Sequence, residues 1–295
     1  MRRPAGIQLI APAMLAIAAL AACMAPGARQ DMAAQTFDVQ VPAGAHQLPG
    51  TLFVAQGPGP HPTVVWFHGF PGLPAPMPEA VKTLRDAGLN VLHVHYSGSW
   101  GTPGSFGPAS AMQDAAAVLA HVRAAPASWR VDREHIITAG DSFGSWVALQ
   151  AAAADPRVAC VAGALMLDLG RTGRDIASSE DMRAAFGGMF AQVEQDASLG
   201  FELDGGAAGL MASIVDGHVR HDLHALGSRL AGRPVLLIGA AEDELAPIDA
   251  HLLPVAEALA AAGADVTHKV LPGGHEIPDS AYAGIVADWA RGSCD

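Results

Sequence analysis

The chain has 295 residues, of which 51% are hydrophobic, and a formal net charge of −12. This length suits one large α/β domain with a sizeable core. Only 17 Lys and Arg residues oppose 29 Asp and Glu, and no basic patch emerges, which excludes nucleic acid as an expected partner. The 33 glycines and 21 prolines stay below the roughly 25–30% of residues that marks a disordered chain, so they indicate turns and loops.

The amino-terminal segment has the pattern of a secretion signal. Arg2 and Arg3 form a charged start, and residues 7–22 form an apolar run that ends in small residues. The run is short for a membrane-spanning helix, which needs about 20 apolar residues. We therefore predict a signal peptide over 1–22, a linker over 23–35 and one folded domain over 36–295.

The end of that signal, Leu20-Ala21-Ala22-Cys23, resembles a bacterial lipobox. The resemblance implies that Cys23 becomes the first mature residue and carries lipid, and several acyl chains would anchor the protein stably to a membrane. By the usual sorting pattern of such lipoproteins, Met24 implies the bacterial outer membrane, with the protein on the periplasmic side of the cell envelope. An ordinary secretory signal that is cleaved near the same place is the alternative.

Hydrophobic runs then alternate with amphipathic segments. Two short strands over 36–41 and 51–55 are expected to form an antiparallel edge hairpin. Residues 63–67 form a continuous apolar run, which is typical of a strand buried on both faces. The later strands are predicted at 89–95, 158–167, 234–239 and 265–271, and the helices at 78–88, 109–124, 249–262 and 279–291. A further strand begins at Ile136, and an alanine-rich helix follows Gly144. This order predicts an α/β fold with a mostly parallel, doubly wound sheet.

The alternation stops over residues 171–233. Helical patterns follow one another at 179–195, 207–215 and 222–230 without strands between them. We expect this segment to form a helical cap over the carboxyl edge of the sheet, where the sites of α/β proteins lie. Its Met and Phe residues are expected to pack the cap, and some of them to line an apolar pocket.

The motif Gly140-Asp141-Ser142-Phe143-Gly144 joins a β-branched run to an alanine-rich helix. Strand, sharp turn and helix in this order predict a nucleophile elbow with Ser142 at its apex. Small residues are needed two places away on each side, because the strand and helix backbones pass close together there. A simple Gly-Ser turn would look the same, so the assignment depends on partners downstream.

A serine nucleophile needs a base, and histidine suits the task with an ordinary pKa near 6.5. His275 follows the last predicted strand on a glycine-rich loop that can lean over the sheet edge. The other candidates, His93, His95, His251 and His268, lie in predicted strands or a helix and are expected to be structural.

The acid that orients the base should follow an earlier strand. Asp243 comes just after the predicted strand 234–239 and is assigned this role. Glu242 and Glu244 flank it, and Asp168 follows another strand, so these carboxylates remain alternatives.

Two main-chain N–H groups are expected to form an oxyanion hole, those of Phe143 and Phe70. His68 is expected to brace the loop that carries Phe70.

Together these features resemble the α/β-hydrolase superfamily. The resemblance rests on the segment 68–72, the elbow 140–144, Asp243 and His275, in that order, and covers roughly 45–170 and 232–292. The stretch 96–106 resembles the prolyl-oligopeptidase and dienelactone-hydrolase branch, although Ser142 stands where a dienelactone hydrolase has Cys. The resemblance implies a Ser-His-Asp triad and no cofactor.

Two further groups have weaker patterns. Cys160 and Cys294 could pair in an oxidising compartment, but Cys160 lies in an apolar run and is predicted to be a buried thiol. His218, His221 and His224 recur every third residue, as zinc ligands on a helix can. No other ligand cluster supports them, so no metal is predicted.

The sequence therefore predicts a serine hydrolase that cleaves carboxylic esters through an acyl-enzyme. A small peptidase or amidase is the alternative enzyme, acting on a short peptide instead of a small-molecule ester. A non-catalytic envelope protein of the same fold that binds ligands is the alternative of another class.

Overall fold

The computed structural model describes residues 32–76 and 78–294. One sheet of eight strands runs through the molecule. In chain order the strands are β1 (Gln35–Ala43), β2 (His46–Val54), β3 (His61–Phe67), β4 (Asn90–Val94), β5 (Val131–Asp141), β6 (Cys160–Ala164), β7 (Pro234–Ala240) and β8 (Asp265–Leu271).

The strand order across the sheet is β1-β2-β4-β3-β5-β6-β7-β8. β1 and β2 form an antiparallel hairpin, and β2 pairs antiparallel with β4. All later pairs are parallel. The predicted edge hairpin and the mostly parallel sheet are thus confirmed. The burial of each strand depends on its place in the sheet. Exposed and buried residues alternate in part of the edge strand β1, whereas every residue of the interior strands β4 and β6 is buried.

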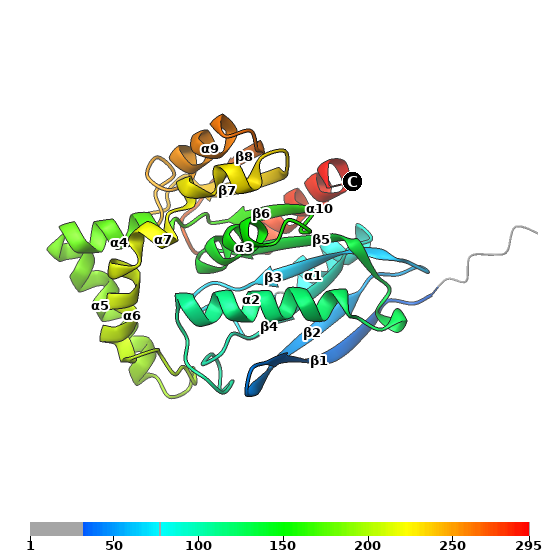
Figure 1. The fold of residues 1–295 in the computed structure, drawn as a ribbon, viewed down its shortest axis with the longest axis horizontal. Helices are drawn as coiled ribbons and strands as arrows, with labels where there is room; N and C mark the ends of the chain where they lie inside the picture. The colour runs from blue at the N-terminus through cyan, green and yellow to red at the C-terminus, as the bar shows by residue number, and fades with distance from the viewer. Residues whose placement is uncertain (1–31, 77, 295) are drawn as a thin grey trace, which may run out of the picture.

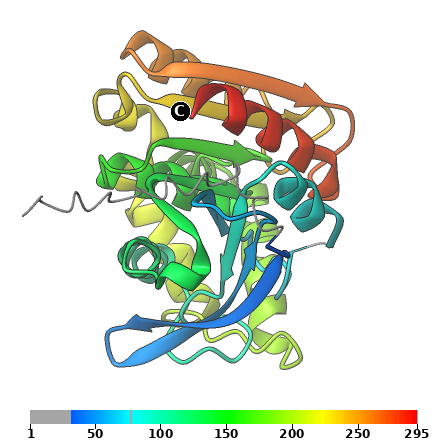
Figure 2. The ribbon, with the colours of Figure 1, turned by 90° about the vertical axis from the view of Figure 1, so that its right-hand side faces the viewer.

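Helices cover both faces of the sheet (Figures 1 and 2). One face packs against α2, α3 and α9, and the other against α1 and α10, so the core has two layers. Figure 2 shows α1 and α10 side by side, and the two helices are in contact. The bounds of these helices are α1 (Pro78–Asp86), α2 (Pro108–Arg123), α3 (Phe143–Ala154), α9 (Leu252–Ala261) and α10 (Ser280–Ser293).

The segment between β6 and β7 is helical, as expected, and projects from one end of the sheet (Figure 1). Its helices are α4 (Leu169–Ser178), α5 (Glu180–Gln195), α6 (Gly206–Asp216), α7 (His218–His221), the 3₁₀ turn η2 (Leu223–Leu226) and α8 (Gly227–Leu230). We call α4, α5, α6 and α7 the cap.

The cap differs from the prediction in two places. The helix α4 was not predicted, because its pattern is interrupted by glycines and arginines. The segment 222–230, predicted as a single helix, forms η2 and α8 instead, and the extended Asp222 separates it from α7, with its side chain accepting a hydrogen bond from the His224 N–H. An N-cap of this kind ends one helix and begins the next.

The cap is tied to the core through α3. The indole N–H of Trp146 donates to the carbonyl of His221 at 2.9 Å, and the amide of Gln150 donates to the carbonyl of Arg220 at 3.1 Å. Both side chains are buried. Because α3 begins at Ser142, the same helix carries the elbow and holds the cap.

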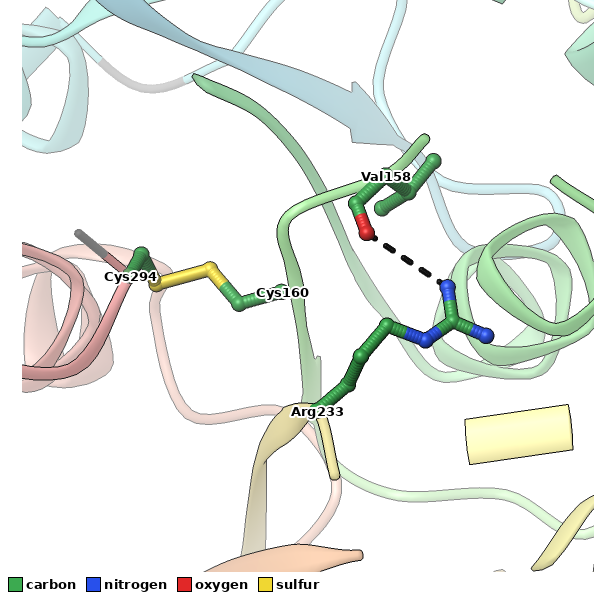
Figure 3. Close-up of a disulfide and its surroundings, with 4 residues drawn as sticks. All are labelled: Val158, Cys160, Arg233 and Cys294. Carbon is green, nitrogen blue, oxygen red and sulfur yellow. Dashed lines mark hydrogen bonds between the residues drawn. A yellow bond between two sulfur atoms is a disulfide. The ribbon is translucent and has the colours of Figure 1, made fainter. Parts of the chain in front are cut away.

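The expectation that Cys160 is a free buried thiol is wrong. Cys160, at the start of β6, forms a disulfide with Cys294, which follows α10 (Figure 3). The Cα atoms are 5.6 Å apart across a separation of 134 residues. The pairing arises because α10 packs on β6 and β7. Spacing in the sequence could not show this proximity.

A second cross-connection lies beside the disulfide. The guanidinium of Arg233 donates to the carbonyls of Ala152 at 2.6 Å and Val158 at 3.4 Å (Figure 3). It therefore joins the beginning of β7 to the end of α3 and the entry to β6.

The predicted signal peptide 1–22 and the lipidation site Cys23 lie outside the described residues. Within 32–76 and 78–294, none of the helices combines the length and apolar character that crossing a bilayer requires.

Candidate active site

Ser142 stands between β5 and α3 in a conformation that few residues adopt, with φ 51° and ψ −121°. Its N–H donates to the carbonyl of Ala164 on the neighbouring strand at 2.9 Å. A Cβ atom on Gly140 would lie 2.3 Å from the carbonyl oxygen of Gly144, and one on Gly144 would lie 2.0 Å from that of Phe67. Both glycines are therefore required by the close approach of backbones, and the turn has the geometry of a nucleophile elbow.

Three of the predicted site residues meet at this turn. His275 Nε2 lies 2.8 Å from Ser142 Oγ, and His275 Nδ1 lies 2.8 Å from Asp243 Oδ2. A carboxylate can only accept, so Nδ1 carries the proton and Nε2 is free to take one from the hydroxyl. The arrangement has the geometry of a base that is oriented by an acid and bonded to a nucleophile.

Asp243 is held in place by the main chain. Its Oδ1 accepts hydrogen bonds from the N–H groups of Leu245 at 3.0 Å and Ala246 at 2.8 Å. Burial acts to raise the pKa of this carboxyl, but the hydrogen bonds from His275 and the two amides outweigh it and hold the pKa below its ordinary value. Asp243 therefore stays ionised at neutral pH.

The two loops that carry Asp243 and His275 follow adjacent parallel strands, β7 and β8. The N–H of Glu242 donates to the carbonyl of Gly273 at 2.9 Å, and the Glu242 carboxylate accepts from the Gly273 N–H. Glu242, one of the alternative acids, thus joins the loops to each other. Asp168, another alternative, caps α4 and accepts from the N–H groups of Gly170 and Leu223.

The predicted oxyanion donors lie on either side of Ser142. Phe143 is the first residue of α3, so its N–H has no acceptor within the helix. Phe70 belongs to the loop after β3. This loop passes so close to the elbow that a Cβ atom on Gly69 would lie 3.4 Å from Ser142 Cβ.

Two cavities meet at Ser142. The smaller, which we call the apolar pocket, has a volume of about 40 Å³ and is closed by the cap. Apart from Ser142 its walls are apolar, formed by Phe70, Phe106, Phe143, Leu167, Leu169, Phe186, Met189, Phe190, Leu210, Ile214 and Leu245. The expected contribution of cap Phe and Met side chains to such a pocket is confirmed.

The larger, which we call the acidic cavity, has a volume of about 420 Å³. It lies between the loop after β3 and the segment from His275 to α10, and its polar walls include His68, His93, Asp141, Ser142, His275, Glu276 and Asp279. The sequence did not indicate that Glu276 and Asp279 belong to the site, although both follow His275 within four residues.

Asp141, directly before Ser142, is anchored to β3. Its Oδ1 accepts a hydrogen bond from Trp66 Nε1 at 3.0 Å. Burial, together with the nearby negative charge of Asp279, raises the pKa of Asp141 to about 6, against the opposing effect of the Trp66 hydrogen bond.

His68 and His93, beside the acidic cavity, are neutral at pH 7. Burial and the nearby His95 lower the pKa of His93 to about 3, and burial likewise lowers the pKa of His68 well below its ordinary value. The side chain of His68 packs between Tyr96 and Trp100, with ring centroids 4.3 Å and 4.1 Å away. This packing fits its predicted role in bracing the loop.

The histidines that recur every third residue in the cap do not converge. His218 Nδ1 and His221 Nε2 contact the main-chain carbonyls of Val215 and Ser213. His224 instead lies with Asp168 and Asp222, and ligand atoms of these three residues come within 4.8 Å of one another. The guanidinium of Arg174 offsets part of the negative charge of this group, since it lies 3.0 Å from Asp222 and 3.7 Å from Asp168.

No protein-family model and no curated protein matches this chain. Solved structures do match its fold. A thermophilic carboxylesterase cloned from a metagenomic library is 19% identical, with a TM-score of 0.64 over 90% of this chain and 91% of its own. A Pyrococcus furiosus esterase is 16% identical, with a TM-score of 0.62 over 89% and 94%.

A Pyrococcus horikoshii acylaminoacyl peptidase is 14% identical, with a TM-score of 0.61 over 88% of this chain but only 42% of its own. At identities this low, the structural similarity establishes the fold alone, and the substrate stays open. The chain therefore has the α/β-hydrolase fold, with a helical cap.

Proposed function

We propose that this protein is a serine hydrolase that cleaves carboxylic esters through an acyl-enzyme intermediate. The observation that carries the proposal is the continuous chain of contacts from Ser142 Oγ to His275 Nε2 and from His275 Nδ1 to Asp243, each 2.8 Å long. This chain of contacts begins at the nucleophile elbow, and two cavities meet at Ser142.

In the proposed reaction, Ser142 Oγ attacks the ester carbonyl while His275 takes its proton. Asp243 keeps the imidazole in the required tautomer and stabilises its positive charge. The main-chain N–H groups of Phe70 and Phe143 stabilise the oxyanion, and one such donor is typically worth about 2.7–4 kcal/mol in the transition state. Water then releases the acid from Ser142, again with His275 as the base. The reaction calls on no cofactor.

Hydrolysis of a short peptide or an amide is the second candidate, because acyl transfer to serine serves amides as well as esters. It is favoured by the carboxylates of Asp141 and Asp279 beside Ser142, which could receive a substrate amino group. A non-catalytic binding role is disfavoured, since binding alone does not require His275 to be aligned with both Ser142 and Asp243.

We further propose that the protein acts in the bacterial cell envelope, anchored by lipid on Cys23, on the periplasmic side of the outer membrane. The lipobox-like end of the segment 1–22 supports this location. Mass spectrometry of the mature amino-terminal peptide would test it, because the acyl chains on Cys23 increase the mass of that peptide. The increase should be absent in Cys23→Ser.

The function is tested with p-nitrophenyl esters of increasing acyl length, using residues 24–295. We expect hydrolysis with a preference for short acyl chains, and loss of turnover in Ser142→Ala and His275→Ala. Ser178→Ala, at an exposed serine on α4, is the matched control and should hydrolyse like the parent. Turnover that survives Ser142→Ala would contradict the mechanism, whereas turnover of peptides and not of esters would favour the second candidate.

A further inference from the structure

The acidic cavity has an unbalanced charge. Three carboxylates lie in its walls: Asp141 at the end of β5, Glu276 directly after His275, and Asp279 just before α10. Among the described residues, 32–76 and 78–294, no Lys or Arg lines it. A concave surface with one sign of charge attracts ligands of the opposite sign.

Asp141 retains capacity to bind a ligand. Its carboxylate receives hydrogen bonds from the Trp66 indole and the Gly69 main chain, but an ionised carboxylate offers about four acceptor positions. Within residues 32–76 and 78–294, no Lys or Arg nitrogen lies within ion-pair distance of it. A buried carboxylate is costly unless a positive or hydrogen-bonding group compensates it.

His68, which also lines the acidic cavity, does not balance its negative charge. The residue is 97% buried, with a relative exposure of only 3%. Its Nδ1 lies 2.7 Å from the carbonyl of Gly69, so Nδ1 donates and Nε2 is left with a lone pair. In the described part of the chain, this buried Nε2 has no hydrogen-bond partner. With its one N–H engaged and its Nε2 enclosed by protein, the neutral His68 offers neither a positive charge nor a free donor to the carboxylates of the cavity.

The cavity also has an aromatic wall. The rings of Trp66 and Tyr282 lie nearly parallel, with centroids 6.0 Å apart and an angle of 8° between their planes. Both residues line the cavity. Because the two rings stack on each other and are almost fully buried, they give the cavity an apolar wall against which the carbon atoms of a ligand can pack.

The position of His275 decides which part of a substrate enters each cavity. The departing oxygen must take its proton from His275 Nε2 and so must lie within reach of that atom. His275 lines the acidic cavity and is not among the residues that line the apolar pocket. The alcohol part of the ester therefore occupies the acidic cavity, and the acyl part occupies the apolar pocket.

We propose that the preferred substrates are esters of amino alcohols, in which a protonated amine on the leaving group is bound by Asp141 and Asp279. This inference rests on the proposed esterase function and names its substrate class. When Ser142 Oγ bonds to the acyl carbon, the bond to the alcohol oxygen breaks and His275 delivers the serine proton to that oxygen. The amino alcohol leaves with its ammonium proton unchanged, and water then hydrolyses the acyl-enzyme.

The test compares two butyrate esters of nearly identical shape, dimethylaminoethyl butyrate and isoamyl butyrate. Dimethylaminoethyl butyrate has a protonated nitrogen where isoamyl butyrate has a C–H group. The rates of alkaline hydrolysis of the two esters without enzyme give the difference in their intrinsic reactivity. After that correction, we expect kcat/KM to favour the amino ester by about tenfold or more, as hydrogen bonds to a charged group allow. Asp141→Asn and Asp279→Asn should each reduce this ratio by about threefold or more.

Asp288→Asn is the matched control. It removes one negative charge from the exposed face of α10, where Asp288 pairs with Arg291, and should leave the ratio unchanged. Because each variant is judged by a ratio of two substrates, a change in folding or in the chemical step cancels. If one of the two cavity variants fails to fold, the other decides.

A corrected ratio near one in the parent enzyme, or a ratio that survives both cavity variants while isoamyl butyrate is hydrolysed, would overturn this inference alone. If neither ester is hydrolysed and a fluorophosphonate probe does not label Ser142, the proposed function itself fails. The two failures are therefore distinguishable.

Discussion

The two cavities at Ser142 are built differently. The apolar pocket is closed by α5 and α6 of the cap, whose apolar side chains surround about 40 Å³. The acidic cavity, about ten times larger, lies against α10, which the disulfide joins to the sheet. If Ser142 is the nucleophile that we propose, the two cavities would receive two unlike halves of a substrate. Under the proposed function, apolar burial would select one half of the substrate, and charge and hydrogen bonding would select the other.

A change at Asp243, which orients His275, should reduce turnover equally whatever substrate the two cavities hold. We expect Asp243→Asn to reduce kcat by about 10³–10⁴-fold, because an amide no longer fixes the His275 tautomer or stabilises the imidazolium. The measurement is kcat for p-nitrophenyl acetate and butyrate. Glu244→Gln, at the exposed neighbouring carboxylate, is the control and should change kcat little. Equal losses in both variants would contradict the assignment of Asp243.

Removal of the disulfide should affect the acidic side most. We expect the double change Cys160→Ala and Cys294→Ala to lower the free energy of unfolding by about 2–5 kcal/mol, as loss of a native disulfide does. Urea denaturation measures this, with the parent protein under reducing conditions as a second comparison. The preference for the amino ester should fall more than the preference among acyl lengths, since α10 borders only the acidic cavity. An equal fall in both preferences would contradict this division.

The buried charge of Asp141 should make stability depend on pH. Its pKa is raised from 3.8 to about 6 by folding, so the folded state holds the proton more tightly than the unfolded state. Stability is therefore lost as pH rises from 3.8 to 6, and the loss is complete above that range.

We expect Asp141→Asn to be more stable than the parent at pH 8 by about 1–3 kcal/mol, and this advantage to vanish near pH 4. Chemical denaturation at both pH values checks the prediction. An advantage of the same size at both values would show that the charge of Asp141 is not its cause.

The smallest effect is expected from the apolar pocket. Phe190→Ala removes a buried ring from its wall and should shift the preferred acyl chain to a greater length, with kcat/KM for p-nitrophenyl octanoate rising about tenfold relative to the acetate. Val219→Ala, at an exposed position on α7, is the control and should leave the chain-length profile unchanged. An unchanged profile in Phe190→Ala would place the acyl group elsewhere.

The sequence predicts the sheet and the residues around Ser142 because local rules decide them. Buried parallel strands are continuous apolar runs, and the elbow requires glycines at 140 and 144 for steric reasons that the structure bears out. The ends of β7 and β8 place Asp243 and His275 together as soon as the strands are known to be neighbours.

The features that escape prediction depend on packing between distant segments. Both the Cys160–Cys294 disulfide and the acidic cavity form because α10 packs against β6 and β7. Asp141 is visible in the motif, but its partners Trp66 and Asp279 lie far away in the chain. The form of the cap likewise depends on contacts that α3 makes with His221 and Arg220.

The central claim is that Ser142 is a nucleophile activated by His275. The most direct measurement is the intact mass of the protein after exposure to a fluorophosphonate, followed by peptide mapping of the adduct. We expect one adduct per chain, located on Ser142, and labelling at least about a hundredfold slower in His275→Ala because the base is missing. An adduct at another residue, or equally fast labelling without His275, would contradict the account.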